Sequence, residues 1–429
     1  MSYRRFEFIK SIAQATVYAF ASVTLISGCS CASGSDISLA SEASSEVPIE
    51  QAEATPITDD SNGLNLVDGC ISRIFIQKNT NGADDGVERL IKLMEENGQP
   101  FYRTAQSPEG IIASDDIVIL KINCQWDKRG GTNTDLIKSV AKAISAHPDS
   151  FTGEVIVADN GQKQFGSRGV GGSLDWDDAN SLSKDQSALD VVNELKDSMN
   201  ISGSLWDEIT MNKVAEYDTG DMEDGFVVEE QILPAGLEVS YPKFESEYGR
   251  KISFKRGVWD EANQAYEMDR LKIINMPVLK THALFQVTGA IKSYMGTTAS
   301  KLTGQRSHNS VSAGGMGAQM AGSRVPALNI MDMIWIGSEH GPGIIYENAS
   351  ETDMIAASTD PVALDFWCAK NVLIPEVSKD PMGAVAALDP SGTSPGIFGH
   401  WLRLSMDELN KAGFKATMDE AKMEAFMSE

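Results

Sequence analysis

The amino-acid sequence predicts an α/β fold, with a mostly parallel sheet and helices on both of its faces. From about residue 71 onward, short apolar runs of strand length alternate with helix-length amphipathic segments. This alternation is typical of parallel sheets that are covered by helices. The composition, 42% hydrophobic and 7% aromatic over 429 residues, fits a globular protein of one large or two medium domains. A division into two lobes with the site between them stays open.

The first part of the globular region supplies the clearest elements. The predicted strands are Ile71–Gln77, Ile117–Asn123 and Glu154–Asn160. The predicted helices are Asp85–Gly98, 134–147 with Thr134 as N-cap, and Ala188–Met199. Residues 201–270 are less regular, and we interpret them as an insertion or a small lobe. Further on, Asp360 followed by Pro361 predicts a helix start, and two short amphipathic helices are expected at Asp407–Ala412 and Met418–Phe426.

The N-terminus has the pattern of an export signal. Two arginines precede an apolar stretch that ends in Leu-Ile-Ser-Gly directly before Cys29. Residues 1–29 therefore resemble a bacterial lipoprotein signal, in which Cys29 is lipidated. The segment YRRFEFIK also resembles a twin-arginine signal, and the general secretory route is the alternative. The prediction is an exported, membrane-anchored lipoprotein that faces the periplasm or the cell exterior.

Residues 30–66 are rich in Ser, Ala, Glu and Asp, which predicts a flexible acidic tether before a globular domain at 67–429. The net charge of -25 argues against nucleic acid as a partner, and against contact with a membrane except through the lipid anchor. Protein partners are not indicated. Because the chain has no Cys-x-x-Cys run, no iron-sulfur cluster is expected. One disulfide among Cys70, Cys124 and Cys368 stays open.

The stretch from Leu271 to His308 carries most of the candidate chemistry. Its apolar start, Leu271–Leu279, predicts a buried parallel strand with a ligand site at its carboxyl end. Lys280 and His282 follow directly, then Lys292 on a helix-like turn after Thr288 and Gly289, and then His308 in a polar loop. Two of the five histidines of the chain lie here. Histidines that are only structural, held by hydrogen bonds, are the alternative.

Polar residues also follow the second and third predicted strands. A parallel sheet presents ligand-binding groups at these ends. We expect contact with an anionic substrate or a cofactor, against the alternative of solvated loop charges. The candidates are Lys121, Asn123, Asp127, Lys128, Arg129, Asp159 and Asn160. Asp332 is expected to orient a histidine or to cap a helix, and Asp365 is a weaker candidate for facing the site.

Several motifs together resemble the family catalogued as domain of unknown function 362. The resemblance covers about Ile71–Leu373, and its motifs are IVILKINCQWDKRGGTNTDLIKSVAKAI, EVIVADNG, IINMPVLKTHALFQVTGAIKSYMGT, LNIMDMIWIGSEHGPG and IAASTDPVALDFW. Some members of that family carry a ferredoxin-like cysteine module, which this sequence lacks. The family name implies no established activity.

The arrangement of His282, Lys292 and His308 is more distantly similar to the core of the lactate racemase family. That resemblance implies a nickel pincer nucleotide cofactor, with His282 as the proton-transfer group, Lys292 as the covalent attachment point and His308 as the metal ligand. The sequence departs from that family in two places: the loop DNGQKQFG has no histidine to act as a second base, and Ile291 replaces an arginine before the cofactor lysine.

These observations lead to two function hypotheses. The first is an exported enzyme with nickel or another transition metal and a lysine-linked organic cofactor, which acts on a small hydroxy acid or related anion by proton or hydride transfer. It would be an isomerase or an oxidoreductase. The alternative is a non-catalytic lipoprotein that binds a small anion or a partner protein.

Overall fold

The computed structural model describes residues 72–162, 171–339, 341, 343–380 and 383–429. The predicted signal, the predicted tether, Cys29 and Cys70 lie outside these residues. Within the described residues, no helix has both the length and the apolar character that crossing a membrane requires.

The core of the described chain is a mixed, mostly parallel sheet of ten strands, and the predicted α/β class is confirmed. Its main path runs β15-β1-β14-β13-β10-β2-β3-β4, and β11 and β12 extend it beside β13. The strands are β1 (Ser72–Lys78), β2 (Ile117–Lys121), β3 (Glu154–Asp159), β4 (Ile201–Leu205), β10 (Leu271–Asn275), β11 (Val278–His282), β12 (Gln286–Thr288), β13 (Leu328–Gly337), β14 (Ala349–Ser358) and β15 (Met423–Ser428). From β13 to β4 every pair on this path is parallel.

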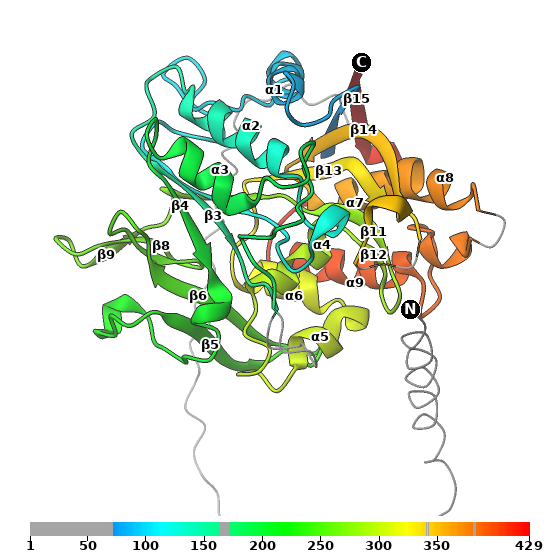
Figure 1. The fold of residues 1–429 in the computed structure, drawn as a ribbon. Coiled ribbons are helices and arrows are strands. Elements are labelled where there is room, and N and C mark those ends of the chain that lie inside the picture. The colour runs from blue at the N-terminus through cyan, green and yellow to red at the C-terminus, as the bar shows by residue number, and fades with distance from the viewer. Residues whose placement is uncertain (1–71, 163–170, 340, 342, 381–382) are drawn as a thin grey trace, which may run out of the picture. The chain divides into compact units, whose positions relative to one another are not determined.

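Helices cover both faces of this sheet (Figure 1). One face carries α1 (Gly86–Glu96), α2 (Thr134–Ser145) and α3 (Ala188–Leu195), whose apolar side chains share a hydrophobic cluster with Val118 and Val157. The other face carries α4 (Ala290–Ser293), α6 (Gly315–Gly322), α7 (Pro361–Cys368) and α9 (Phe398–Lys411), which share a cluster with Ile119 and Ile156. Two clusters form because successive strand residues point to opposite faces. Two short helices, α5 (Arg306–Ser310) and α8 (Ile374–Val377), complete the second side.

A second sheet lies within residues 201–270. It is antiparallel, in the order β5 (Gly225–Ile232), β6 (Glu238–Glu245), β7 (Lys251–Ser253), β8 (Gly257–Asp260) and β9 (Ala265–Glu267). Its side chains Phe244 and Phe254 belong to the same hydrophobic cluster as Ile119 of the central sheet. The first residues of the 201–270 range form β4, which belongs to the central sheet and not to the antiparallel sheet. The two-lobe arrangement stays a prediction.

The apolar run Leu271–Leu279 forms two strands and not one. The chain leaves β2 after Asn275, and β11 then pairs with β13. Pro277 explains the break, because proline has no N–H to donate to a sheet. On either side of it, Met276 N donates to Lys121 O at 2.8 Å, and Pro277 O accepts from Asp332 N at 2.8 Å. The predicted ligand-binding end of the strand is therefore the end of β11.

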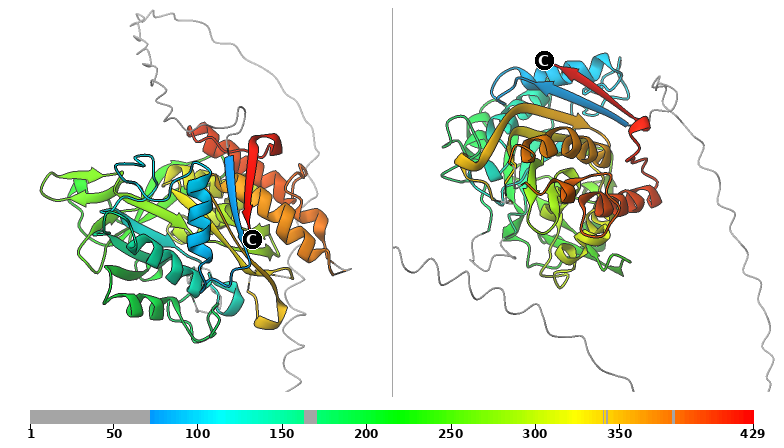
Figure 2. Two further views of the ribbon diagram at one scale, coloured as in Figure 1. Left: turned by 90° about the horizontal axis from the view of Figure 1, so that it is seen from above. Right: turned by 90° about the vertical axis from the view of Figure 1, so that its right-hand side faces the viewer.

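The C-terminal prediction was wrong in one element. Residues Met418–Phe426 were expected to form a helix, but their second half forms β15, parallel to β1, with Phe426 opposite Phe75. The rings of these two residues stack with centroids 5.5 Å apart. The first and last strands of the described chain consequently lie side by side, coloured blue and red in Figures 1 and 2. The expected helix at Asp407–Ala412 is the end of the longer α9.

Two predicted helix starts had different outcomes. Asp360 caps α7, because its carboxylate accepts from Val362 N and Ala363 N at 2.9 and 3.1 Å, and Pro361 is the first helical residue. Thr134 is not the cap of α2. Asn133 caps that helix instead, and its Oδ1 accepts from Leu136 N at 3.0 Å.

Candidate functional site

A small polar cavity lies at the carboxyl ends of the central strands. The chain order explains its place: from β2 the path goes outward to β3 and β4, whereas β10 and β13 lie on the other side of β2. Ligands bind at such a switch point in open α/β sheets. The cavity volume is about 20 Å³, and its lining residues are Lys121, Asn123, Gln125, Trp126, Asp159, Gln162, Lys280, Thr288, Lys292, Ser293 and Gly296. Five of the predicted site residues thus come together.

Lys121 and Asp159 form a fully buried ion pair at the floor of this cavity. Lys121 Nζ lies 3.0 Å from Asp159 Oδ1, and it also donates to Ile122 O and to Ser293 Oγ, both at 2.9 Å. The second carboxylate oxygen of Asp159 accepts from Cys124 N at 2.9 Å. Two of the three N–H bonds of this ammonium are thus used in hydrogen bonds, and its contact with Asp159 Oδ1 is an ion pair. The pair joins the ends of β2 and β3.

The two predicted asparagines, Asn123 and Asn160, also form hydrogen bonds within the protein. Asn160 donates from Nδ2 to Thr298 O at 2.7 Å, and its Oδ1 accepts from Gln162 N at 2.9 Å. Asn123 is half-buried, and its Oδ1 accepts from Gln125 N at 3.2 Å. Asn160 therefore connects the end of β3 to the segment after α4, and Asn123 is the asparagine that lines the cavity.

Lys280 and Thr288 lie directly opposite each other on the β11–β12 hairpin. Residues paired in this way point to the same side of the hairpin, and both side chains line the cavity. Lys280 is 1% exposed, and its Nζ donates to Gly130 O at 2.5 Å. The buried hydroxyl of Thr288 has no hydrogen-bond partner within the described part of the chain. Both groups therefore keep unused donors that face the cavity.

Lys292, on α4, is the least satisfied charge of the site. It is 8% exposed, and among the described residues its ammonium makes no hydrogen bond and has no carboxylate within 4.0 Å. Its nearest described partner is the ring of Phe285, 5.5 Å away. Burial, and then the charge of Lys121, lowers the pKa of Lys292 to about 8. Burial, and then the charge of Lys292, lowers the pKa of Lys280 to about 7.

The turn that carries Lys292 is held by Asp365, which is fully buried on α7. The carboxylate accepts from Ala290 N at 2.5 Å and from Ile291 N at 3.0 Å, the first two N–H groups of α4. A Cβ at Gly289 would overlap Asp365 Oδ1, so only glycine permits this approach. Burial raises the pKa of Asp365 to about 7. Asp365 thus stabilises the turn that carries Lys292, and it is not among the cavity-lining residues.

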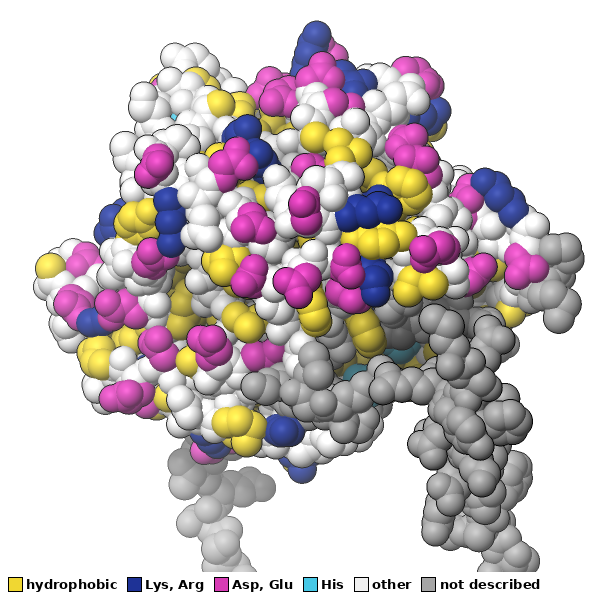
Figure 3. Space-filling view, in the orientation of Figure 1, with side chains coloured by type: hydrophobic (Ala, Val, Ile, Leu, Met, Phe, Trp, Pro, Cys, Tyr) yellow, Lys and Arg dark blue, Asp and Glu magenta, His cyan; other side chains and the backbone are white. Residues whose placement is uncertain are grey.

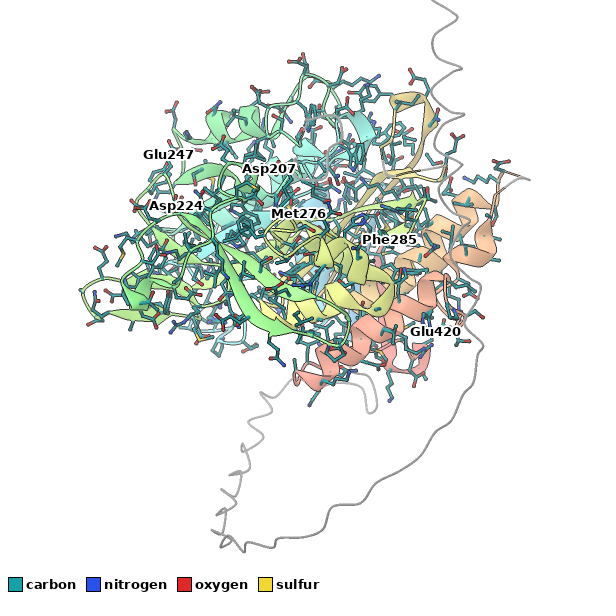
Figure 4. All side chains as sticks on the ribbon, turned by 90° about the horizontal axis from the view of Figure 1, so that it is seen from below. Asp207, Asp224, Glu247, Met276, Phe285 and Glu420 are labelled. Atoms are coloured by element: carbon teal, nitrogen blue, oxygen red, sulfur yellow. The ribbon has the colours of Figure 1, made fainter. Side chains whose placement is uncertain are left out.

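His282 and His308 lie on either side of the Phe285 ring, each with ring centroids 5.1 Å from it. Figure 4 labels Phe285, whose carbonyl accepts from Trp401 Nε1 of α9 at 3.0 Å. His282 Nδ1 accepts from Leu284 N and Phe285 N at 3.1 and 3.2 Å. The proton of the neutral ring is therefore on Nε2. Burial and the charge of Lys292 lower the pKa of His282 to about 2, and the same causes lower that of His308.

The surroundings of the cavity differ in charge from the cavity itself. Acidic side chains are spread over the face shown in Figure 3, and histidine side chains are visible in a hollow of that face. The net charge of the chain is -25, whereas the cavity contains three lysines and one aspartate. The cavity therefore concentrates lysine side chains within an acidic protein, and such a cluster favours the binding of a small anion.

Other sequence candidates lie outside the cavity. Arg129 is buried, with its guanidinium 4.3 Å from the ring centre of Trp335 and 5.1 Å from that of Tyr346. Asp127 and Lys128 are partly exposed and pair with each other. Asp332 accepts from Asn133 N at 2.8 Å, which favours the capping alternative. Cys124 and Cys368 are both buried and do not form a disulfide with each other, and Cys70 lies outside the described residues.

The sequence reasoning did not select Thr288, Ser293 or Gly296 as site residues. Thr288 could have been found from its position, because it lies eight residues after Lys280 in a short hairpin, but the hairpin pairing had to be known first. Gly296 is required because a Cβ there would overlap Asp159 Oδ1. This signal depends on atoms far apart in the sequence.

The residues fit only part of the predicted cofactor chemistry. Lys292 offers an unpaired buried amine for a covalent link, and His308 offers one neutral imidazole for a metal. No group of three or more His, Cys, Asp or Glu side chains within the described chain is arranged to hold a metal ion, so further ligands would have to come from the organic group. His282 offers a hydrogen-bond donor at Nε2 and not a free lone pair, which fits the predicted acid-base role poorly.

The comparison with protein families adds one finding. Residues 228–370 match the model described as Domain of unknown function (DUF362). The matched residues make up about a third of the chain and are similar to this family. The matched segment contains β11, β12, α4 and α5, and thus Lys280, Thr288, Lys292 and His308. No curated protein and no solved structure matches the chain. The resemblance to the lactate racemase family stays a prediction.

Proposed function

We propose that this DUF362 protein is an exported, lipid-anchored enzyme in which Lys292 carries a covalently linked organic cofactor. Its substrate would be a small anion such as a hydroxy acid. The observation that supports this is that Lys292 is only 8% exposed as a residue and that its amine makes no hydrogen bond to a described residue. An unpaired buried charge is costly, so a protein keeps one mainly where it has a use. With a pKa of about 8, roughly a tenth of the amine is the nucleophilic free base at pH 7.

The roles of the other residues follow from their positions. Lys280 and Thr288 would orient the anion, and His308 would bind a metal through its neutral ring. The organic group with its nickel or other transition metal would supply the acceptor for proton or hydride transfer. The Phe285 ring contacts both histidine rings and lies 5.5 Å from the Lys292 amine.

Elemental analysis and intact mass measurement of protein from its native host test this proposal. We expect a stoichiometric transition metal and a mass adduct on the Lys292 peptide, together with a lipid on Cys29. The Lys292→Met variant should lose the adduct. Lys196→Met, which changes a partly exposed lysine paired with Glu247, should keep it. A bare polypeptide mass without metal would remove the cofactor enzyme from consideration.

The second candidate is a non-catalytic lipoprotein that binds a small anion. The state of His282 favours it, because an imidazole whose Nδ1 already accepts two N–H bonds and whose pKa is lowered to about 2 is a poor base. A bare mass combined with tight anion binding would support this candidate over the enzyme.

A further inference from the structure

The donors that remain unused in the cavity have a common orientation. Lys280 and Thr288 come from opposite strands of one hairpin at paired positions, and Lys292 follows one turn later on α4. All three line the same cavity. Lys280 uses one of its N–H bonds, on Gly130 O, and neither the Thr288 hydroxyl nor the Lys292 ammonium donates to a described residue.

The acidic groups near the cavity do not neutralise this set. Asp159 is the carboxylate of the lining, and it is paired with Lys121 at 3.0 Å. Asp332 accepts from Asn133 N and Ile334 N, and it makes no described ion pair with Lys280 within 4.0 Å, although its charge acts on that lysine from a greater distance. Two ammonium groups and one hydroxyl are left to be satisfied by something other than the described protein.

We propose that Lys280 and Thr288 form an oxyanion-binding site that takes one oxygen of a carboxylate or phosphate group, and that the Lys292 ammonium adds its charge to this site in protein molecules without a cofactor on that amine. This inference rests on the proposed function only in assuming that the ligand is a small anion. The volume of about 20 Å³ has room for about one water-sized atom. The rest of the ligand would extend past Asn123, Gln125 and Gln162, which are partly exposed. Charge-assisted hydrogen bonds of this kind are the strong ones.

The alternative is that Lys280 and Lys292 are both neutral and that the cavity binds no ligand. The two cases differ in how protons are coupled to binding. An anion stabilises the charged form of each lysine and so raises its pKa. Binding at pH 8 would then take up protons, and the affinity would fall as the pH rises above the range of about 7 to 8 where the two amines lose their protons. A structural cavity would show neither effect.

Calorimetric titration of purified protein of verified mass with acetate and with inorganic phosphate, at pH 7 and pH 9, tests the site. We expect at least one of the two anions to bind, and the better one identifies the ligand as a carboxylate or a phosphate. Binding at pH 7 should be at least tenfold tighter than at pH 9. Lys280→Met and Thr288→Val should each weaken it by about tenfold, the loss expected for one good hydrogen bond.

Lys196→Met is the matched control and should bind like the unchanged protein. Urea unfolding of each variant shows whether it is folded. Both site variants should keep a cooperative unfolding transition, because Thr288→Val removes a hydroxyl without a described partner and Lys280→Met removes a buried charge together with its one bond to Gly130 O. If neither anion binds, or if Lys280→Met and Thr288→Val bind as tightly as the control, the site is wrong. That outcome leaves the adduct on Lys292 untouched, so the two proposals fail separately.

Discussion

The cavity and the antiparallel sheet region each bury lysine side chains, but Lys243 of the sheet region is paired with a carboxylate, whereas Lys292 of the cavity has no described ion pair. In the sheet region, Lys243 is fully buried, and its Nζ donates to Asp221 O at 2.6 Å and lies 4.3 Å from the ring centre of Tyr217. In the cavity, Lys292 is 8% exposed and has only a ring 5.5 Å away among the described residues. The same residue type is thus satisfied in one region and unsatisfied in the other.

The antiparallel sheet region also contains a carboxylate whose hydrogen bonds are made within the protein. Glu216 accepts from the hydroxyls of Tyr241, Ser253 and Tyr266 at 2.9, 2.9 and 2.7 Å, and this set is called the Glu216 cluster. Every hydrogen bond of the cluster joins separate strands or turns of the sheet region. Figure 4 shows the two regions apart, with Asp224 and Glu247 labelled on the sheet side and Phe285 on the cavity side. A polar network that stabilises a fold completes its own bonds, whereas a binding site leaves bonds for its ligand.

The largest expected difference comes from removing one charge in each region. Glu216→Leu leaves the hydroxyls of Ser253 and Tyr266 without their acceptor and that of Tyr241 with only Glu229 at 3.3 Å, and it should lower the free energy of unfolding by about 2 to 4 kcal/mol. Lys292→Met removes a buried charge that no described group satisfies, so it should leave the free energy of unfolding unchanged or raise it by about 1 kcal/mol. Urea unfolding followed by circular dichroism measures both. A large loss of stability in Lys292→Met would show that the lysine has a structural partner.

The pH dependence of the Lys292→Met effect sharpens the comparison. The pKa of Lys292 is about 8 in the folded protein, below its ordinary value of 10.5. Below pH 8 the folded state carries the cost of the buried charge. Between about pH 8 and 10.5 the amine is protonated mainly in the unfolded chain, so the stability of the unchanged protein rises with pH. The advantage of Lys292→Met should therefore be greatest below pH 8 and disappear toward pH 10.5. Unfolding curves at pH 7, 8.5 and 10 decide this, and a constant difference would contradict it.

The smallest expected effect compares two buried threonines. Thr132 Oγ1 accepts from Asn123 N at 2.8 Å and donates to Met276 O at 2.7 Å, whereas Thr288 Oγ1 has no described partner. Thr132→Val should therefore cost about 1 to 3 kcal/mol, because it leaves a buried N–H and a buried carbonyl without a partner. Thr288→Val should cost less than about 0.5 kcal/mol. Equal losses in the two variants, measured by urea unfolding, would mean that the Thr288 hydroxyl is satisfied inside the protein.

The fold could be predicted where each element carries its own periodic signal. The runs at 117–121 and 154–159 are fully buried in β2 and β3, and their residues 117–120 and 155–158 are all apolar, as in parallel strands when helices cover both faces of the sheet. The prediction failed at Met418–Phe426, where β15 is half-exposed and owes its strand pairing to β1 from the other end of the chain. A weak local pattern can be overridden by such a partner.

Residue types and strand order were enough to predict which residues lie near the site, but not which of them form hydrogen bonds with each other. The sequence by itself determined that Lys121, Asn123, Asp159, Lys280 and Lys292 would meet at the carboxyl edge, because parallel strand ends share one edge of the sheet. Only the tertiary structure decided which of these charges are free. Lys121 forms an ion pair with Asp159 and donates to Ser293, while Lys292 is left without a described hydrogen-bond partner. Pairing depends on distances of a few ångströms between segments more than a hundred residues apart, such as Lys121 and Ser293, and no local pattern encodes them.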